Sequence, residues 1–222
     1  MAEYRVVETF TSINGEGRKA GELAFFLRLA GCNLNCSYCD TKWANETYVK
    51  YTVMDENEIY RMIKDSGVKN VTITGGEPLF RKDMEILFEK LNADRELSVE
   101  IETNGSVDLS HFLAVCNNIS FTMDYKLPSS GMENRMCLSN FDILRKTDTV
   151  KFVSGSIKDL EKAKDIIEKY DLTRRVKVYL SPVFGKIEPS DMVEFMKDNN
   201  MNDVRLQLQL HKFIWEPDKK GV

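Results

Sequence analysis

The sequence lacks the features that mark several common classes of protein. No apolar run approaches the roughly 20 residues that a membrane-spanning helix needs, and the first residues, MAEYRVVETF, do not have the basic and then apolar pattern of a signal peptide. An excess of basic residues is also missing, because the net charge is −4, and a general nucleic-acid binder needs a basic face. We therefore expect a cytoplasmic protein that binds neither membranes nor nucleic acids.

Cysteine is scarce and unevenly placed. The 222 residues include five cysteines, which is not the pattern of a disulfide framework in a chain of this length. Cys32, Cys36 and Cys39 stand together in the stretch GCNLNCSYCDTKW, spaced C-x3-C-x2-C. Cys116 and Cys137 lie apart from them, and we expect these two to be structural.

The rest of the sequence alternates strand-like apolar runs with amphipathic, helix-like runs. Strands are predicted at 22–31, 68–74, 97–103, 118–125, 148–155, 175–182 and 203–210, and helices within 54–67, 82–91, 109–115, 157–170 and 190–199. Such alternation is typical of a parallel α/β fold with right-handed crossovers. The chain is too short for eight full units, so the sequence predicts a single domain, 1–222, built as an incomplete (β/α)6-type TIM barrel.

Polar and glycine-rich segments follow the predicted strands. The cysteine stretch follows the first strand, GGEP (75–78) the second, NG (104–105) the third and KLPSSG (126–131) the fourth. Barrel-like β/α enzymes place their active sites at the carboxyl ends of the strands. The sequence therefore predicts an active site at this end, with the irregular stretch 126–140 as a loop that covers it.

Three clustered thiols indicate a metal site, because thiolates are soft ligands that suit zinc or iron–sulfur clusters. Structural zinc sites and electron-transfer clusters usually take four protein ligands, and Cys116, Cys137, His111 and His211 are all distant in the sequence. Three ligands on a four-iron cluster leave one iron open to another molecule, which favours catalysis. A zinc knuckle and unliganded buried thiols are the alternatives.

The cysteine spacing, with Tyr38 before the last cysteine and GGEP one βα unit later, resembles the radical S-adenosylmethionine (SAM) superfamily. Within it, the chain resembles the 7-carboxy-7-deazaguanine synthases in the segments SINGEG (12–17), FLRLAGCNLNCSYCDT (26–41), TGGEP (74–78), ETNG (102–105), PSSG (128–131), KFV (151–153) and QLHKFIW (209–215). The resemblance implies a lyase of queuosine biosynthesis that converts 6-carboxy-5,6,7,8-tetrahydropterin to 7-carboxy-7-deazaguanine and releases ammonia. It also implies a homodimer and a reductant such as a flavodoxin or ferredoxin.

The same resemblance implies cofactors and contacts, residue by residue. A 4Fe-4S cluster would be bound by Cys32, Cys36 and Cys39, and Mg2+ by Thr41. SAM would contact Tyr38, Cys39, Asp40, Gly76, Glu102, Asp124, Tyr125 and Lys126, and the pterin Ile13, Asn14, Gly15, Glu16, Arg28 and Thr74. Relatives commonly carry glutamine where this chain has Asn14, and often SPK where it has Asp124–Lys126. The resemblance assigns no acid–base catalyst.

Several of these side chains have plainer readings. Arg28 suits a bidentate contact with the substrate carboxylate, but a salt bridge to a neighbouring acid is the alternative. Thr41 could cap the cysteine loop, and Glu102 could pair with Lys126 or Lys151.

The roles of two residues near the end of the chain are also left undecided by the sequence. His211 and Trp215 could cap the substrate pocket or pack at a dimer interface. For the tryptophan, packing is favoured because large aromatic side chains contribute mainly through buried area.

Two other functions fit part of the pattern. A radical SAM activase, which makes a glycyl radical on a partner protein, also uses C-x3-C-x2-C, but INGEG, Arg28 and Thr41 speak against it. A metal-binding module without catalysis is the second alternative, and it would hold zinc rather than iron and labile sulfide.

Overall fold

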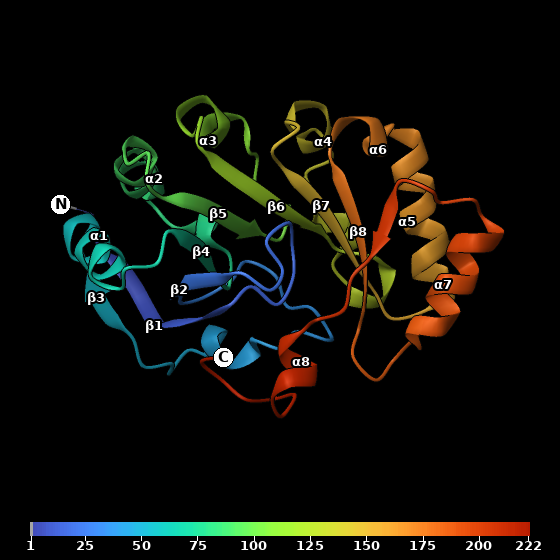
Figure 1. The fold of residues 1–222 in the computed structure, drawn as a ribbon, viewed down its shortest axis with the longest axis horizontal. Coiled ribbons are helices and arrows are strands. Elements are labelled where there is room, and N and C mark those ends of the chain that lie inside the picture. The colour runs from blue at the N-terminus through green and yellow to red at the C-terminus, as the bar shows by residue number, and fades with distance from the viewer. Residues whose placement is uncertain (1) are drawn as a thin grey trace.

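The structure is a computed structural model that describes residues 2–222. One curved sheet of nine strands runs through it, with most of the helices along its convex side (Figure 1). The strands are β1 (Tyr4–Ile13), β2 (Leu23–Leu29), β3 (Thr52–Met54), β4 (Asn70–Gly75), β5 (Ser98–Thr103), β6 (Ile119–Tyr125), β7 (Thr149–Ser154), β8 (Lys177–Pro182) and β9 (Val204–Leu206). The helices are α1 (Glu56–Asp65), α2 (Met84–Ala93), α3 (Ser110–Val115), α4 (Asn140–Ile143), α5 (Ile157–Lys169), α6 (Leu172–Arg175), α7 (Pro189–Asp198) and α8 (His211–Ile214).

The sheet is an open partial barrel, as the sequence predicts. Strands β2 and β4 to β9 pair in parallel in chain order, and the full order is β3-β1-β2-β4-β5-β6-β7-β8-β9. β1 is antiparallel to both β2 and β3. Neither β1 nor β3 was predicted, and the last predicted strand, 203–210, shortens to β9. No helix in the described part of the chain is long and apolar enough to cross a membrane.

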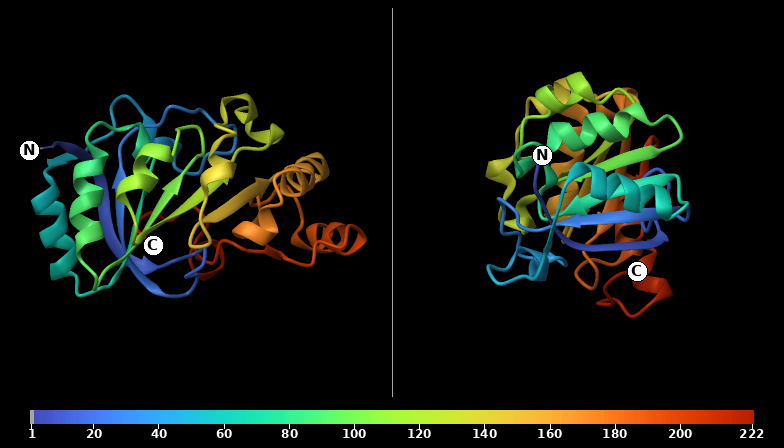
Figure 2. Two further views of the ribbon diagram at one scale, coloured as in Figure 1. Left: turned by 90° about the horizontal axis from the view of Figure 1, so that it is seen from above. Right: turned by 90° about the vertical axis from the view of Figure 1, so that its left-hand side faces the viewer.

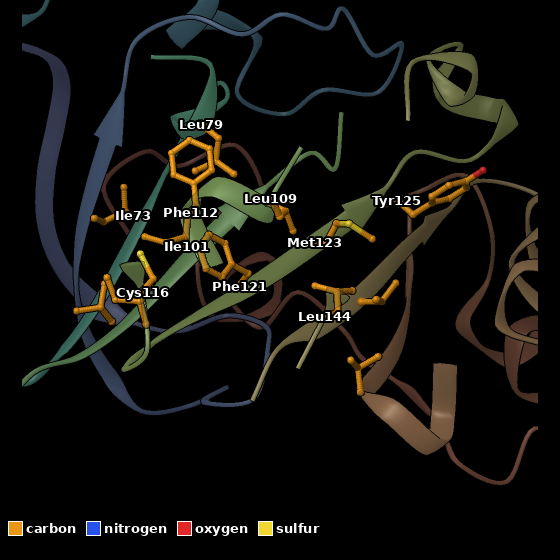
Figure 3. Close-up of a cluster of buried hydrophobic side chains, with 14 of the residues drawn as sticks. Ile73, Leu79, Ile101, Leu109, Phe112, Cys116, Phe121, Met123, Tyr125 and Leu144 are labelled. Carbon is orange, nitrogen blue, oxygen red and sulfur yellow. The ribbon is translucent and has the colours of Figure 1, made fainter. Parts of the chain in front are cut away.

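Alternation along the strands separates an apolar face from a polar one. In β6, Phe121 and Met123 are buried in the hydrophobic core, whereas Thr122 and Asp124 point to the opposite, concave side. Figure 3 shows Phe121 near Phe112 of α3 and near Cys116, and Met123 next to Leu109. Burial of each large apolar side chain in this layer contributes about 1.5–3 kcal/mol, so the convex side stabilises the fold and the concave side is left free for polar chemistry.

The convex core confirms the structural role expected for Cys116, whose side chain is fully buried there. The expected loop 126–140 is irregular apart from two short 3-10 turns, η3 (Pro128–Ser130) and η4 (Glu133–Arg135). It lies beside the cysteine loop, because the Ser37 backbone N–H donates to Ser130 O at 3.0 Å and the Ser37 hydroxyl to Ser129 O at 2.6 Å.

The C-terminal segment crosses the concave side and joins the two ends of the sheet. In Figures 1 and 2 it leaves β9 in red and approaches the blue loop between β1 and β2. Gly17 N donates to Gln207 Oε1 at 2.7 Å, and Gln207 Nε2 donates to Gly17 O at 3.0 Å. Leu210 N donates to Gly15 O at 3.0 Å. These bonds hold the β1–β2 loop inside the curve of the sheet.

Candidate functional site

The cysteine loop follows β2 at the carboxyl end of the parallel strands. Cys32, Cys36 and Cys39 are all free thiols. Cys32 Sγ accepts hydrogen bonds from Leu34 N at 3.4 Å and from Asn104 Nδ2 at 3.5 Å. Burial raises the pKa of the Cys32 and Cys36 thiols, and the other cysteines of the loop add to the rise, so the three sulfur groups lie close enough to influence one another.

The three thiols of the loop suit three of the four irons of a four-iron cluster. Within residues 2–222, no three His, Cys, Asp or Glu side chains converge as ligands of one metal ion. A four-iron cluster instead takes each thiolate on a different iron, so its ligands stand further apart. Three free thiols on one loop beyond the core strands can each serve a different iron.

GGEP packs directly against the start of the cysteine loop. A Cβ on Gly76 would lie 2.0 Å from Gly31 O, and a Cβ on Gly75, at φ +139°, would lie 2.3 Å from Leu29 O. Glu77 N donates to Gly31 O at 3.0 Å. The glycines are therefore required by the close approach of two backbone segments, a reason for the motif that sequence reasoning did not give.

Glu77 links the GGEP turn to the ETNG segment through hydrogen bonds. Its side chain is fully buried, and its oxygens accept hydrogen bonds from Thr103 Oγ1 at 2.8 Å, Leu79 N at 3.0 Å and Asn104 N at 2.6 Å. Burial raises the pKa of Glu77 to about 7, although these three bonds act in the opposite direction. The sequence showed Glu77 only as part of a turn, and its bracing of the ETNG segment depends on the pairing of β4 with β5.

Four charged side chains form a row of ion pairs across the concave side. Lys151 Nζ lies 3.2 Å from Glu16 Oε2 and 4.0 Å from Asp124 Oδ2, and Lys126 Nζ lies 2.7 Å from Asp124 Oδ2. All four are mostly buried, with side-chain exposures of 11–18%. This row links Glu16, which was predicted to bind the pterin, to Asp124 and Lys126, which were predicted to bind SAM. Lys151 was not among the predicted site residues.

The charges in this row of ion pairs stabilise one another. Burial alone would raise the pKa of Glu16, but Lys151 and a hydrogen bond from Gln209 bring it below its ordinary value. Burial alone would lower the pKa of Lys151 and Lys126, but Glu16 and Asp124 raise the first and Asp124 raises the second above their ordinary values. Both lysines are therefore cationic and Glu16 is anionic at neutral pH.

Asn14 and Asp124 each keep one buried polar atom without a hydrogen-bond partner among the residues that the structure describes. Asn14 is buried and its Oδ1 accepts from Thr72 Oγ1 at 2.8 Å. Among residues 2–222, nothing bonds to Asn14 Nδ2 or to Asp124 Oδ1. An unpaired buried donor or acceptor costs roughly 1–3 kcal/mol, so these two atoms are suited to a polar ligand.

The remaining predicted pterin contacts gather near the same region. Ile13 ends β1, and Gly15 lies so close to His211 that a Cβ would be 2.6 Å from His211 Nδ1. Arg28 lies beside Thr74 in the β2–β4 register. Arg28 also forms the alternative salt bridge, with its Nε 2.7 Å from Glu8 Oε1.

The remaining residues predicted to contact SAM and Mg2+ differ in their exposure and in their partners. The Tyr38 hydroxyl donates to Val153 O at 3.2 Å, and Thr41 Oγ1 lies 3.6 Å from Cys39 Sγ. Asp40 is exposed. Within the described chain, Glu102 forms neither of the two lysine pairs considered for it.

Tyr125 departs from the rest, because its ring points to the convex core. It packs against Phe141 and Phe152, and its hydroxyl lies 3.4 Å from Glu133 Oε1. Only the backbone of Tyr125 therefore borders the site.

Sequence reasoning left His211 open, and the structure brings it to the site. Burial lowers the pKa of its imidazole, while Glu16, Asp40 and Glu102 on the concave side act to raise it. Its helix, α8, was not predicted, because no pattern in the last residues shows that the tail folds back to the β1–β2 loop.

Comparisons with known proteins agree with this geometry. Residues 27–123 match the model of the Radical SAM superfamily. A 7-carboxy-7-deazaguanine synthase of Clostridium acetobutylicum is 60% identical over 219 residues, which is 99% of each chain. One of Chlorobaculum tepidum is 36% identical and covers 100% of this chain and 98% of its own. The crystal structure of QueE from Escherichia coli matches with a TM-score of 0.75 and 25% identity over 93% of this chain and 94% of that one.

Proposed function

The chain belongs to the 7-carboxy-7-deazaguanine synthase family of radical SAM enzymes, and from this premise we propose how its residues serve the reaction. It is a lyase of queuosine biosynthesis that converts 6-carboxy-5,6,7,8-tetrahydropterin to 7-carboxy-7-deazaguanine and releases ammonia. The observation that carries this conclusion is the 60% identity over 99% of the chain. The predicted family and function are confirmed, and the activase and the non-catalytic module are set aside.

The enzyme uses a 4Fe-4S cluster and SAM, as the family does. Bound together, they supply reductive cleavage of a carbon–sulfur bond and abstraction of a hydrogen atom from the pterin. We assign Cys32, Cys36 and Cys39 to three irons of the cluster. The free thiols and their position beyond the core strands support this assignment.

SAM is assigned to the residues between the cysteine loop and β6. Asp124 Oδ1, buried and without a partner in residues 2–222, suits a hydroxyl or ammonium donor of SAM. Lys126 fixes the other oxygen of the same carboxylate at 2.7 Å. The other proposed contacts are Tyr38, Cys39, Asp40, Gly76, Glu102 and the backbone of Tyr125.

The pterin is assigned to the β1–β2 loop and the neighbouring strand ends. Asn14 Nδ2 suits an acceptor such as the pterin carbonyl, since Thr72 already occupies its Oδ1. Arg28 keeps donors for the substrate carboxylate, because the bond to Glu8 uses only its Nε. Ile13, Gly15, Glu16 and Thr74 complete the proposed contacts.

Mg2+ is assigned to Thr41. A neutral hydroxyl is a modest ligand, but Mg2+ usually keeps several waters and takes few protein ligands. The ion would orient the substrate carboxylate beside the cluster loop. The position of Thr41 two residues after Cys39 supports this reading.

The remaining proposals concern the whole chain. We propose a single domain, supported by the continuous sheet, and a cytoplasmic enzyme, supported by its five free cysteines. A homodimer and electron supply by a flavodoxin or ferredoxin are carried over from the family.

The test is anaerobic turnover of the reconstituted enzyme with SAM, reductant, Mg2+ and the carboxypterin. We expect the deazapurine product and ammonia in equal amounts. Cleavage of SAM without either product would contradict the proposed substrate site.

A further inference from the structure

One ammonium group joins the two halves of the proposed site. Lys151, on β7, lies 3.2 Å from Glu16 Oε2 and 4.0 Å from Asp124 Oδ2. Glu16 belongs to the loop assigned to the pterin, and Asp124 to the strand end assigned to SAM. No other side chain in the described chain pairs with acids of both groups.

The two carboxylates do not share Lys151 equally. At 3.2 Å the ammonium donates a hydrogen bond to Glu16, but at 4.0 Å it only attracts Asp124. Glu16 also accepts from Ser181 Oγ at 3.2 Å and from Gln209 Nε2 at 3.2 Å, so it holds its position without Lys151. Asp124 has one oxygen bonded to Lys126 and one oxygen without a partner in the described part of the chain.

We propose that Lys151 is a positioning residue that couples binding of the pterin to binding of SAM. The inference depends on the substrate and SAM sites proposed above. A pterin N–H that donates to Glu16 takes over the acceptor that Lys151 now uses. The ammonium then moves toward Asp124, fixes its carboxylate and holds the free oxygen ready for SAM. Burial of the group strengthens the effect, because water does not screen the charges.

Coupling of this kind is reciprocal. If bound pterin raises the affinity for SAM by a given factor, bound SAM raises the affinity for the pterin by the same factor. Measured couplings between sites are typically about 5-fold to 150-fold. We expect the wild-type enzyme to show at least about fivefold coupling in both directions.

The test measures binding rather than turnover. The reconstituted holoenzyme is kept anaerobic and without reductant, so that SAM is not cleaved. The Kd for SAM is measured by calorimetry with and without saturating carboxypterin, and the Kd for the pterin with and without SAM. The variants are Lys151→Met, Lys151→Arg and Glu16→Gln, and Lys64→Met is the matched control because Lys64 pairs with Asp94 and Glu96 on the outer surface.

We expect Lys151→Met to reduce the coupling factor to about 1, Lys151→Arg to retain most of it and Lys64→Met to match the wild type. If Lys151→Met does not fold, Glu16→Gln decides, because it weakens the same ion pair and must lower the coupling. Wild-type coupling in Lys151→Met or Glu16→Gln would overturn the inference, as would absence of coupling in the wild type. Failure of the wild type to bind either ligand would instead overturn the proposed sites and the inference together.

Discussion

Arg28 and Glu8 face each other across β1 and β2, and the Arg28 Nε donates to Glu8 Oε1 at 2.7 Å. The two side chains are 15% and 21% exposed. The sequence left two interpretations of Arg28 open, a contact with the substrate carboxylate and a salt bridge to a neighbouring acid, and the pair with Glu8 is compatible with both. One edge of the guanidinium is held by Glu8, and a planar group held in this way is oriented for a carboxylate at its other donors.

We predict that Arg28→Lys lowers kcat/KM for the pterin by roughly 100-fold, because lysine cannot reproduce a bidentate contact. Glu8→Gln, which keeps an acceptor for Nε, should lower it about tenfold or less. Steady-state kinetics at saturating SAM measures both. Equal losses in the two variants would mean that Arg28 acts only through its salt bridge.

The three cysteines of the loop are predicted to be individually essential. Cys32→Ala, Cys36→Ala and Cys39→Ala should each abolish SAM cleavage while the far-UV circular dichroism stays unchanged, because the loop lies beyond the core strands. Iron and labile sulfide analysis and the yield of 5′-deoxyadenosine are the measurements. Cys137→Ala, outside the cysteine loop, is the control and should retain the wild-type cluster. Retained SAM cleavage in any loop variant would remove that residue from the ligand set.

The parallel strands were predictable because their apolar runs carry the signal locally. β1 was missed, since YRVVETFTSI mixes polar and apolar residues and gains its place by pairing with β2 and β3. The orientation of Tyr125 was within reach of the sequence. If Asp124 points to the concave side, the next residue must point to the core.

Contacts between distant segments were beyond the sequence. The Lys151–Asp124 approach requires the β6–β7 register, which places these residues side by side. The approach of His211 to Gly15 requires the fold of the tail. Family resemblance supplied the candidate residues, but only the three-dimensional arrangement shows which of them share partners.

Gly76 and Gly155 should respond differently to the same change. Gly76→Ala places a Cβ 2.0 Å from Gly31 O, a backbone atom that cannot move aside, whereas a Cβ on Gly155 has its nearest contacts at an ordinary 3.5 Å. We predict that Gly76→Ala lowers the free energy of unfolding by about 1–3 kcal/mol or more, and that Gly155→Ala changes it by less than about 0.5 kcal/mol. Urea denaturation of the cluster-free protein measures both. Equal stability of the two variants would contradict the close packing of GGEP on the cysteine loop.

Glu77 should make the stability of the cluster-free protein depend on pH. Burial raises its pKa from the ordinary 4.5 to about 7, so between these values the folded state binds a proton that the unfolded state has lost. The resulting stabilisation is fully present below pH 4.5 and is lost as the pH rises through about 7. A shift of this size corresponds to roughly 3 kcal/mol.

The measurement compares wild type with Glu77→Gln, which cannot titrate, by urea denaturation from pH 4.5 to pH 8. Glutamine loses one of the acceptors used by Thr103, Leu79 and Asn104, so Glu77→Gln should be less stable at pH 4.5 by about 1–3 kcal/mol. The difference should then shrink as the pH rises, because only the wild type loses stability through this group. A difference that stays constant, or that grows with pH, would mean that the three hydrogen bonds outweigh burial and keep Glu77 ionised throughout.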